Sequence, residues 1–329
     1  MRLTMTDRVA VAALVLFVLL PLVAGSGLTA DLAIYFAYAL FAVSLAFVWG
    51  QAGLLSLGHG VFFGVGAYGM SLVTLGMIPG LPGLHSTWVG LVVAVVASGL
   101  AAAVTGVLCF AGKGLKGAFF GIVTLAIAFI AERLATSSTW LGGLNGLMNV
   151  PPVTLGLNGE GRAIFEALPL YYISLGVLAA VMAGLSWLLA GRFGTLLAAI
   201  RDNELRIWSL GADVRRIKIQ AYALSGAVAG LAGALFVSQF GFAAPSLIGF
   251  SLSLDVLIWV AIGGRDSLIA AAQGAIAVRL LESRLADLLG PVWPLVLGLL
   301  FMASVIFFPK GLFGSLISAL EPRGQRPAP

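Results

Sequence analysis

The stretch WVGLVVAVVASGLAAAVTGVLCF, residues 88–110, decides the fold class because it carries no charged side chain. As an α-helix rising about 1.5 Å per residue, it is long enough to cross about 30 Å of hydrocarbon. A transmembrane β-barrel would instead show short strands in which apolar and polar residues alternate. The stretch therefore predicts a membrane-spanning helix.

Similar runs recur along the whole chain. Its 329 residues are 60% hydrophobic and 9% charged, whereas soluble domains carry roughly 25% charged residues. The runs predict an all-α, polytopic transmembrane helical bundle of about ten spans in a single domain, 1–329. The segments flanking Gly263 and Gly264 are short enough to be broken or re-entrant helices. The predicted spans are 9–24, 32–49, 60–77, 88–110, 117–134, 168–190, 219–240, 250–263, 267–281 and 291–308.

The residues that enzymes and metal sites need are scarce. Cys109 is the one cysteine and the histidines number 2, which excludes a disulfide framework and a Cys/His metal cluster. The stretch closest to a phosphate-binding loop, GVLCFAGKG at 106–114, has one residue too many between its glycines and a glycine after its lysine. We expect no catalysis and no bound cofactor, so uphill transport would need an ion gradient or an ATP-hydrolysing partner.

Basic residues follow the predicted topology. The pI of about 9.7 is explained by the positive-inside rule, without a nucleic-acid partner. If the N-terminus is cytoplasmic, most Lys and Arg residues fall in the two tails and in 111–116, 191–218 and 264–266. We therefore expect both termini in the cytoplasm and 135–166 as the longest outside loop; alternatively, the first apolar run is a cleaved signal peptide. Four arginines instead lie in or near the segments expected outside: Arg133, Arg162, Arg279 and Arg284.

A glycine-rich stretch, WGQAGLLSLGHGVFFGVGAYG at 49–69, predicts a broken helix or a tight helix contact. Each interior glycine costs about 1 kcal/mol relative to alanine, and backbone groups freed at membrane depth need partners inside the protein. Its polar residues are candidates to line a translocation path, and close packing of small residues is the alternative interpretation. These path candidates are Gln51, Ser56, His59 and Tyr68.

Asp255 is a further path candidate, because it lies inside a predicted span, where an acid is costly unless it is paired or solvated. In a gradient-driven carrier, Asp255 and His59 would be the groups that bind the coupling ion. That carrier, working without an ATPase, is the competing function.

The segment GRFGTLLAAIRDNELRIWSLGADVRRIKIQ, 191–220, is unusually charged for this chain. We expect a short interfacial helix from Thr195 to Leu210 that ends at Gly211 and carries an i,i+4 pair between Asp202 and Arg206. The simplest interpretation is a loop that only fixes topology, but a helix followed by a glycine exceeds that need. We therefore predict a docking element for a partner. Its candidate residues are Ile200, Arg201, Asp202, Glu204, Arg206 and Gly211.

Several stretches, taken in chain order, carry a family resemblance. They are GQAGLLSLGHGVFFGVGAYG (50–69), GAFFGIVTLAIAFI (117–130), LGGLNGL (141–147), the loop and following helix at 191–236, and FFPKGLFG (307–314). Together they resemble the LivH/LivM family of branched-chain amino acid ABC transporter permeases, and the LivM-type subunit more than LivH. In that family the charged loop is the coupling helix that docks on the ATPase.

The resemblance implies an inner-membrane permease that pairs with a homologous LivH-type permease and two LivG/LivF-type ATPase subunits. A periplasmic solute-binding protein would deliver the solute, and ATP-Mg would bind to the partner subunits. The chain departs from the family pattern at Leu141, at Arg206-Ile207 and in GGRDSLIAA (263–271). Similar permeases handle urea or short amides, which leaves such solutes as an alternative to branched-chain amino acids.

Overall fold

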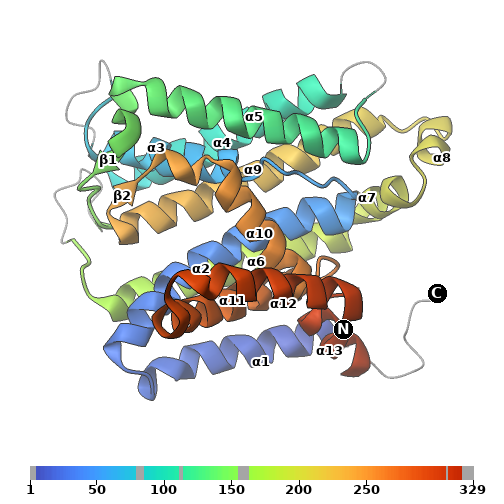
Figure 1. Ribbon diagram of the computed structural model, residues 1–329. Helices are drawn as coiled ribbons and strands as arrows, with labels where there is room; N and C mark the ends of the chain where they lie inside the picture. Colours follow the sequence, from blue (N-terminus) through green and yellow to red (C-terminus); the bar gives the residue numbers. More distant parts are fainter. Residues whose placement is uncertain (1–4, 79–84, 111–113, 155–162, 309, 321–329) are drawn as a thin grey trace.

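The computed structural model describes residues 5–78, 85–110, 114–154, 163–308 and 310–320. Figure 1 shows a bundle of helices whose axes run roughly side by side. Helices α7 and α8 project at one end, where α1 begins and α13 lies, and the short strands β1 and β2 lie at the opposite end. We call these the coupling end and the far end.

The all-α fold is confirmed, and each predicted span falls on a helix. Among the residues that the structure describes, six helical segments are long and apolar enough to cross a membrane, and shorter apolar helices occupy Arg8–Leu22, Gly60–Thr74 and Phe250–Gly263. The helices are α1 (Met5–Leu19), α2 (Ser26–Ala46), α3 (Gly60–Thr74), α4 (Thr87–Phe110), α5 (Ala118–Ser137), α6 (Ala167–Ala190), α7 (Arg192–Asp202), α8 (Glu204–Ser209), α9 (Val214–Phe240), α10 (Phe250–Gly263), α11 (Leu268–Leu289), α12 (Trp293–Phe307) and α13 (Leu312–Leu320). Strands β1 (Leu147–Met148) and β2 (Phe242–Ala243) pair antiparallel.

Helix α2 lies at the centre of the bundle. From Leu32 to Val48 nearly all of its side chains are buried, and it packs against α6, α9, α10 and α11. By contrast, α4, α5 and α6 expose large apolar side chains such as Val104, Phe129 and Trp187. Such exposure suits a surface that faces lipid, since hydrocarbon carries no penalty for it.

Two helices are broken, as the glycine-rich stretches predict. The last turn of α2 widens into a π-helix at Phe47–Gln51, and the chain then leaves helical geometry until α3 begins at Gly60. The second break separates α10 from α11, where Gly264 has φ +132°. Helix α10 has 14 residues, which at about 1.5 Å per residue is too short to cross about 30 Å of hydrocarbon alone.

The glycine stripes on α3 and α9 bring these helices into backbone contact, which confirms the packing interpretation for them. A Cβ atom on Gly66 would collide with the carbonyl oxygen of Gly230, and one on Gly233 would collide with the carbonyl oxygen of Phe63. Because the hydrophobic effect between helices is weak in lipid, the van der Waals packing that such close approach allows stabilises the contact of α3 with α9.

Gly66→Ala is expected to lower the melting temperature of the detergent-solubilised protein, because α3 and α9 must separate to admit the methyl group. Overpacking of this kind costs about 1–3 kcal/mol. Gly176→Ala on α6 is the matched control, since nothing lies within 4 Å of its added Cβ. Equal melting temperatures for the two variants would contradict the backbone contact.

Candidate coupling site and membrane-embedded polar groups

The charged loop forms two short helices instead of the single helix expected from Thr195 to Leu210. Asn203 leaves helical geometry with φ −154°, and its side-chain oxygen accepts a hydrogen bond of 3.0 Å from the Arg206 backbone N–H. Asparagine is a strong N-cap, so it ends α7 and begins α8. The predicted pair of Asp202 with Arg206 is therefore wrong: the Asp202 carboxylate lies 3.6 Å from Arg201.

The charged loop has an inner face and an outer face. Leu197 and Ile200 are buried against the bundle, whereas Asp202 and Arg206 are exposed. Gly211 adopts φ +86° directly after α8, which is the left-handed conformation that ends many helices. The loop thus presents one face to the bundle and one face outward.

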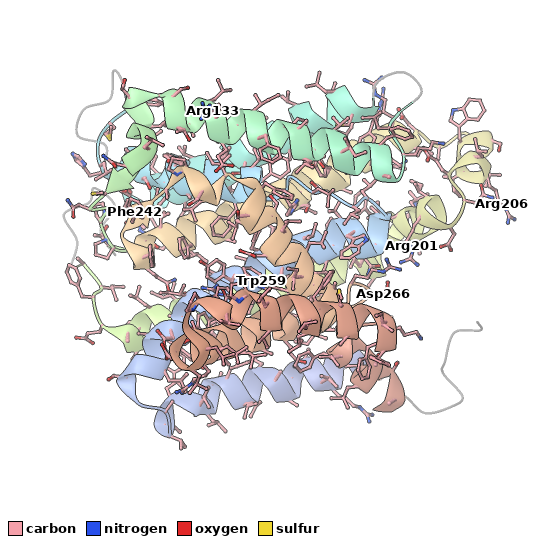
Figure 2. All side chains as sticks on the ribbon, viewed as in Figure 1. Arg133, Arg201, Arg206, Phe242, Trp259 and Asp266 are labelled. Carbon is pink, nitrogen blue, oxygen red and sulfur yellow. The ribbon has the colours of Figure 1, made fainter. Side chains whose placement is uncertain are left out.

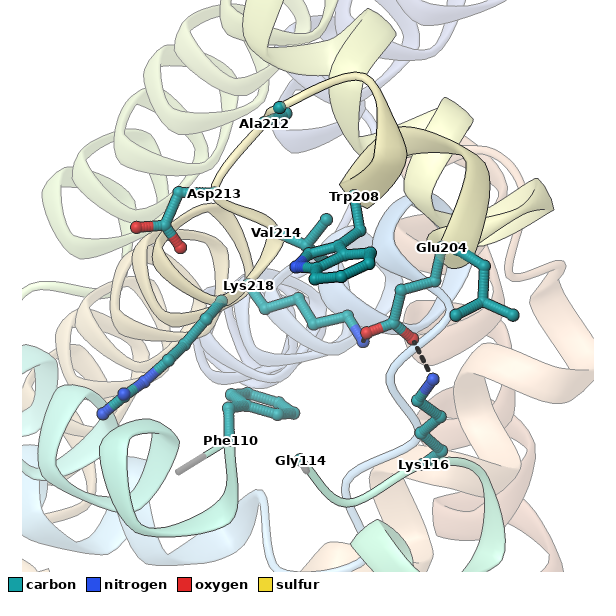
Figure 3. Close-up of a pocket in the computed structure, with 12 residues that line it drawn as sticks. Phe110, Gly114, Lys116, Glu204, Trp208, Ala212, Asp213, Val214 and Lys218 are labelled. Atoms are coloured by element: carbon teal, nitrogen blue, oxygen red, sulfur yellow. Dashed lines mark ion pairs between the residues drawn. The ribbon is translucent and has the colours of Figure 1, made fainter. Parts of the chain in front are cut away.

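Glu204 fixes α8 to two other elements (Figure 3). Its carboxylate lies 2.9 Å from the Lys218 ammonium of α9 and 3.3 Å from that of Lys116, which precedes α5. Lys218 is buried and stands 5.5 Å from the Phe110 ring centroid. Burial raises the pKa of the Glu204 carboxyl, but hydrogen bonds and positive charge from Lys218 and Lys116 outweigh it, so the pKa lies below its ordinary value. Glu204 therefore ties α8 to the bundle through α9 and the segment before α5.

Arg201 fixes α7 to the break in α2. Its guanidinium donates a hydrogen bond to the carbonyl oxygen of Gly50. The neighbouring Gln51 side chain donates to the backbone carbonyl of Asp266, at 3.1 Å. Figure 2 shows Arg201, Arg206 and Asp266 at the same end of the bundle, with Phe242 at the opposite end. Both helix breaks are thus tied to the coupling end.

A cavity of about 650 Å³ opens beside α8. Leu205 and Trp208 line it and, with Leu210, are 69%, 70% and 75% exposed. Exposed apolar side chains of this kind suit an interaction surface, for another protein or for the membrane interface. We call Leu205, Trp208 and Leu210 the apolar triad. The signal in the sequence that could have found it is that all three are large apolar residues outside every predicted span.

The path candidates of 49–69 do not form one site. His59 is fully buried, and its Nε2 lies 2.9 Å from the Ser44 hydroxyl and 3.3 Å from that of Ser225. Ser56 is close by on the same irregular segment and hydrogen-bonds the Tyr222 hydroxyl at 2.9 Å. Gln51 lies apart, at the coupling end.

Tyr68 lies on α3, and its buried hydroxyl has no hydrogen-bond partner among the described residues. The structure thus groups Ser56 with His59 and leaves Tyr68 separate.

Asp255 lies on α10 beside charged residues of α11. The Arg279 guanidinium donates to the Glu282 carboxylate at 2.6 Å and stacks on the ring of Tyr38, 4.6 Å from its centroid. Arg279 lies within α11, inside the predicted span 267–281, and packs on aromatic rings of α2 and α10. Arg162, another of the arginines near the segments expected outside, lies outside the described residues.

A bundle with broken spans and a charged projecting loop defines a membrane transport subunit. The comparison with known families is specific: residues 28–307 match the family described as branched-chain amino acid transport system, permease component. The chain belongs to this family.

Its relatives include the high-affinity branched-chain amino acid transport system permease protein LivM of Escherichia coli (strain K12), 33% identical over 328 residues, covering 92% of this chain and 73% of LivM. LivM of Salmonella typhimurium is 31% identical over 300 residues, 84% of this chain and 67% of that protein. The autoinducer 2 import system permease protein LsrC of Escherichia coli (strain K12 / DH10B) is 31% identical over 207 residues, 59% of this chain and 60% of LsrC. No solved structure matches the chain.

These matches confirm the predicted LivM-type permease. The chain is a non-enzymatic, multi-pass transport component of the inner membrane.

Glu204→Gln is expected to speed hydrogen exchange of backbone amides 204–212 at neutral pH, by a few-fold for a partly buried pair worth about 1 kcal/mol. Because the pKa of the Glu204 carboxyl is lowered in the folded state, its ion pairs stabilise the loop at pH values above the ordinary glutamate pKa. This stability is lost as the pH falls through the pKa of the folded state, so the wild type should approach the variant in acid. Asp202→Asn, which removes an exposed carboxylate, is the control. If both variants exchange alike at neutral pH, Glu204 does not hold the loop.

Proposed function

We propose that this chain is a single-domain permease subunit that imports branched-chain amino acids or a related small amino-acid-like solute. It is driven by partner ATPases that dock on α7 and α8. The observation that carries the proposal is the apolar triad, exposed beside a cavity and held in place by Glu204 and Arg201. A loop that only fixes topology needs neither exposed apolar anchors nor a partly buried ion pair.

The family of ABC importer permeases works with ATPase and solute-binding subunits. For this chain we infer a homologous LivH-type permease, two LivG/LivF-type ATPases and a periplasmic solute-binding protein. ATP-Mg would bind to the ATPases, and no cofactor to this chain. The described beginning of α1 and α13 lie at the same end as the docking helices (Figure 1), which supports cytoplasmic placement of both termini.

The contacts of the loop suggest how movement enters the bundle. When the ATPases close on ATP, α7 and α8 would shift together, since both are anchored to the bundle. Arg201 would pass the shift to Gly50 at the end of α2, and Gln51 would pass it to the turn between α10 and α11. Both connections reach a glycine-broken helix, where small changes in backbone angles are least costly.

Trp208→Ala is expected to weaken association with the ATPases about tenfold or more, and to reduce solute-stimulated ATP hydrolysis in the assembled complex. A buried aromatic anchor at an interface contributes about 2 kcal/mol or more. Trp88→Ala is the control, because Trp88 is 47% exposed at the start of α4, whose opposite end, at Phe110, lies beside the loop. Co-purification of the ATPases and ATP hydrolysis are the measurements.

Unchanged association of the Trp208 variant would overturn docking at the apolar triad. Membrane insertion of both variants, assayed by their yield in washed membranes, separates a docking defect from misfolding.

An ion-coupled carrier remains the second candidate, because Asp255 is only partly buried within a membrane helix. Uptake that collapses with an uncoupler but continues without ATP would favour it. The substrate, amino acid or a neutral urea-like amide, would be identified by which solute raises the melting temperature of the solute-binding protein.

A further inference from the structure

Asp255 and Arg279 lie at similar depth near the middle of the bundle. The turn between α10 and α11 is at the coupling end, where the Asp266 carbonyl accepts the bond from Gln51. Counting about 1.5 Å per residue from this turn places Arg279 roughly 16 Å and Asp255 roughly 12 Å along their helices. The hydrocarbon core is about 30 Å thick. Two of the chain's few charged residues therefore lie at similar depth near mid-membrane.

Two of the three charged residues in this region are paired with each other, and the third is not. Arg279 is paired with Glu282 at 2.6 Å and covered by Tyr38, Tyr35 and Trp259. The Asp255 carboxylate is close enough to interact electrostatically with both Glu282 and Arg279. Among the described residues, however, it forms no hydrogen bond or ion pair. Two carboxylates and one guanidinium leave one carboxylate without a counter-charge.

A purely structural ion pair does not explain this arrangement. The Arg279 and Glu282 side chains are 25% and 16% exposed, and Asp255 is also partly exposed. Exposure of charge to lipid tails is costly, so charged groups at this depth normally face a bundle interior, a partner subunit or water. The Arg279–Glu282 pair alone would hold α11 against Tyr38, and Asp255 would add only a further desolvation cost.

We propose that Asp255, Arg279 and Glu282 form a mid-membrane site for the charged end of a zwitterionic amino acid. The ammonium group would lie between the carboxylates of Asp255 and Glu282, and the carboxylate of the solute would accept hydrogen bonds from Arg279. The proposal rests on the proposed import function and narrows its substrate class. A neutral urea or amide gains little from such a site, whereas a zwitterion would place its ammonium group beside the carboxylate of Asp255 and its own carboxylate beside Arg279.

The site is also connected to the broken helix. The Gly60 N–H at the start of α3 donates to the Ser253 hydroxyl at 2.9 Å, and Ser253 lies on α10 two residues before Asp255. The Tyr38 ring of α2 stands 5.2 Å from the Trp259 ring, so α10 contacts α3 on one side of Asp255 and α2 on the other. Movement at the break would therefore move the carboxylate that holds the ammonium.

The test uses the complete importer, with partner permease, ATPases and solute-binding protein, in proteoliposomes. Uptake of radiolabelled leucine and ATP hydrolysis stimulated by leucine-loaded binding protein are measured for the wild type, Asp255→Asn and Asp255→Glu. Asp287→Asn on the exposed end of α11 is the control for loss of a carboxylate. We expect Asp255→Asn to reduce leucine uptake at least tenfold while stimulated ATP hydrolysis stays within twofold of the wild type. Asp255→Glu should restore part of the uptake.

Normal leucine uptake by Asp255→Asn, in a complex whose wild type imports leucine, overturns the site and leaves the proposed function standing. Loss of uptake together with loss of stimulated ATP hydrolysis in both Asp255 variants, but not in Asp287→Asn, indicates a structural role and also overturns the site. A wild-type complex that stimulates its ATPases but imports no amino acid overturns the proposed substrate class and the site with it.

Discussion

The break between α2 and α3 persists because the polar backbone groups that it frees are bound inside the bundle. Hydrocarbon offers such groups no hydrogen-bond partner, so an irregular segment at this depth needs neighbours that supply one. The Leu57 N–H donates to the Thr124 hydroxyl of α5 at 3.0 Å, and the Gly60 N–H donates to the Ser253 hydroxyl of α10. Glycine at 58 lets the segment approach closely, since a Cβ there would collide with the Thr124 carbonyl oxygen.

This constraint joins otherwise separate parts of the protein. The irregular segment is bound by α5 and α10, while its other end at Gly50 is bound by Arg201 of α7. In the proposed mechanism the docking helices, the break and α10 form one mechanical connection from the coupling end to mid-membrane. His59 is fully buried beside the break and hydrogen-bonds Ser44 and Ser225. These contacts fit a role in holding the irregular segment against α2 and α9.

Much of this architecture follows from the sequence, because hydrocarbon imposes simple rules on length and charge. The predicted span 250–263 coincides with α10, and glycine density at 49–69 predicted the first break. The helix expected from Thr195 to Leu210 is divided by the Asn203 cap, which was not predicted because local competition for backbone hydrogen bonds decides it. The long-range partners were beyond prediction: the contacts of Glu204 with Lys116 and of Arg279 with Tyr38 depend on how helices pack, which periodicity does not specify.

Because the proposed movement enters at Gly50 and α5 holds the other part of the irregular segment, transport in this mechanism requires the segment to move relative to α5. A side chain at Gly121 of α5 would touch Leu57, so cysteines at these two positions, in a Cys109→Ser background, can lock the segment in place. The decisive measurement is solute uptake by the assembled importer with this pair cross-linked and then reduced. The account predicts that uptake stops on cross-linking and returns on reduction, with the ATPases bound throughout. Undiminished uptake by the fully cross-linked protein would contradict it.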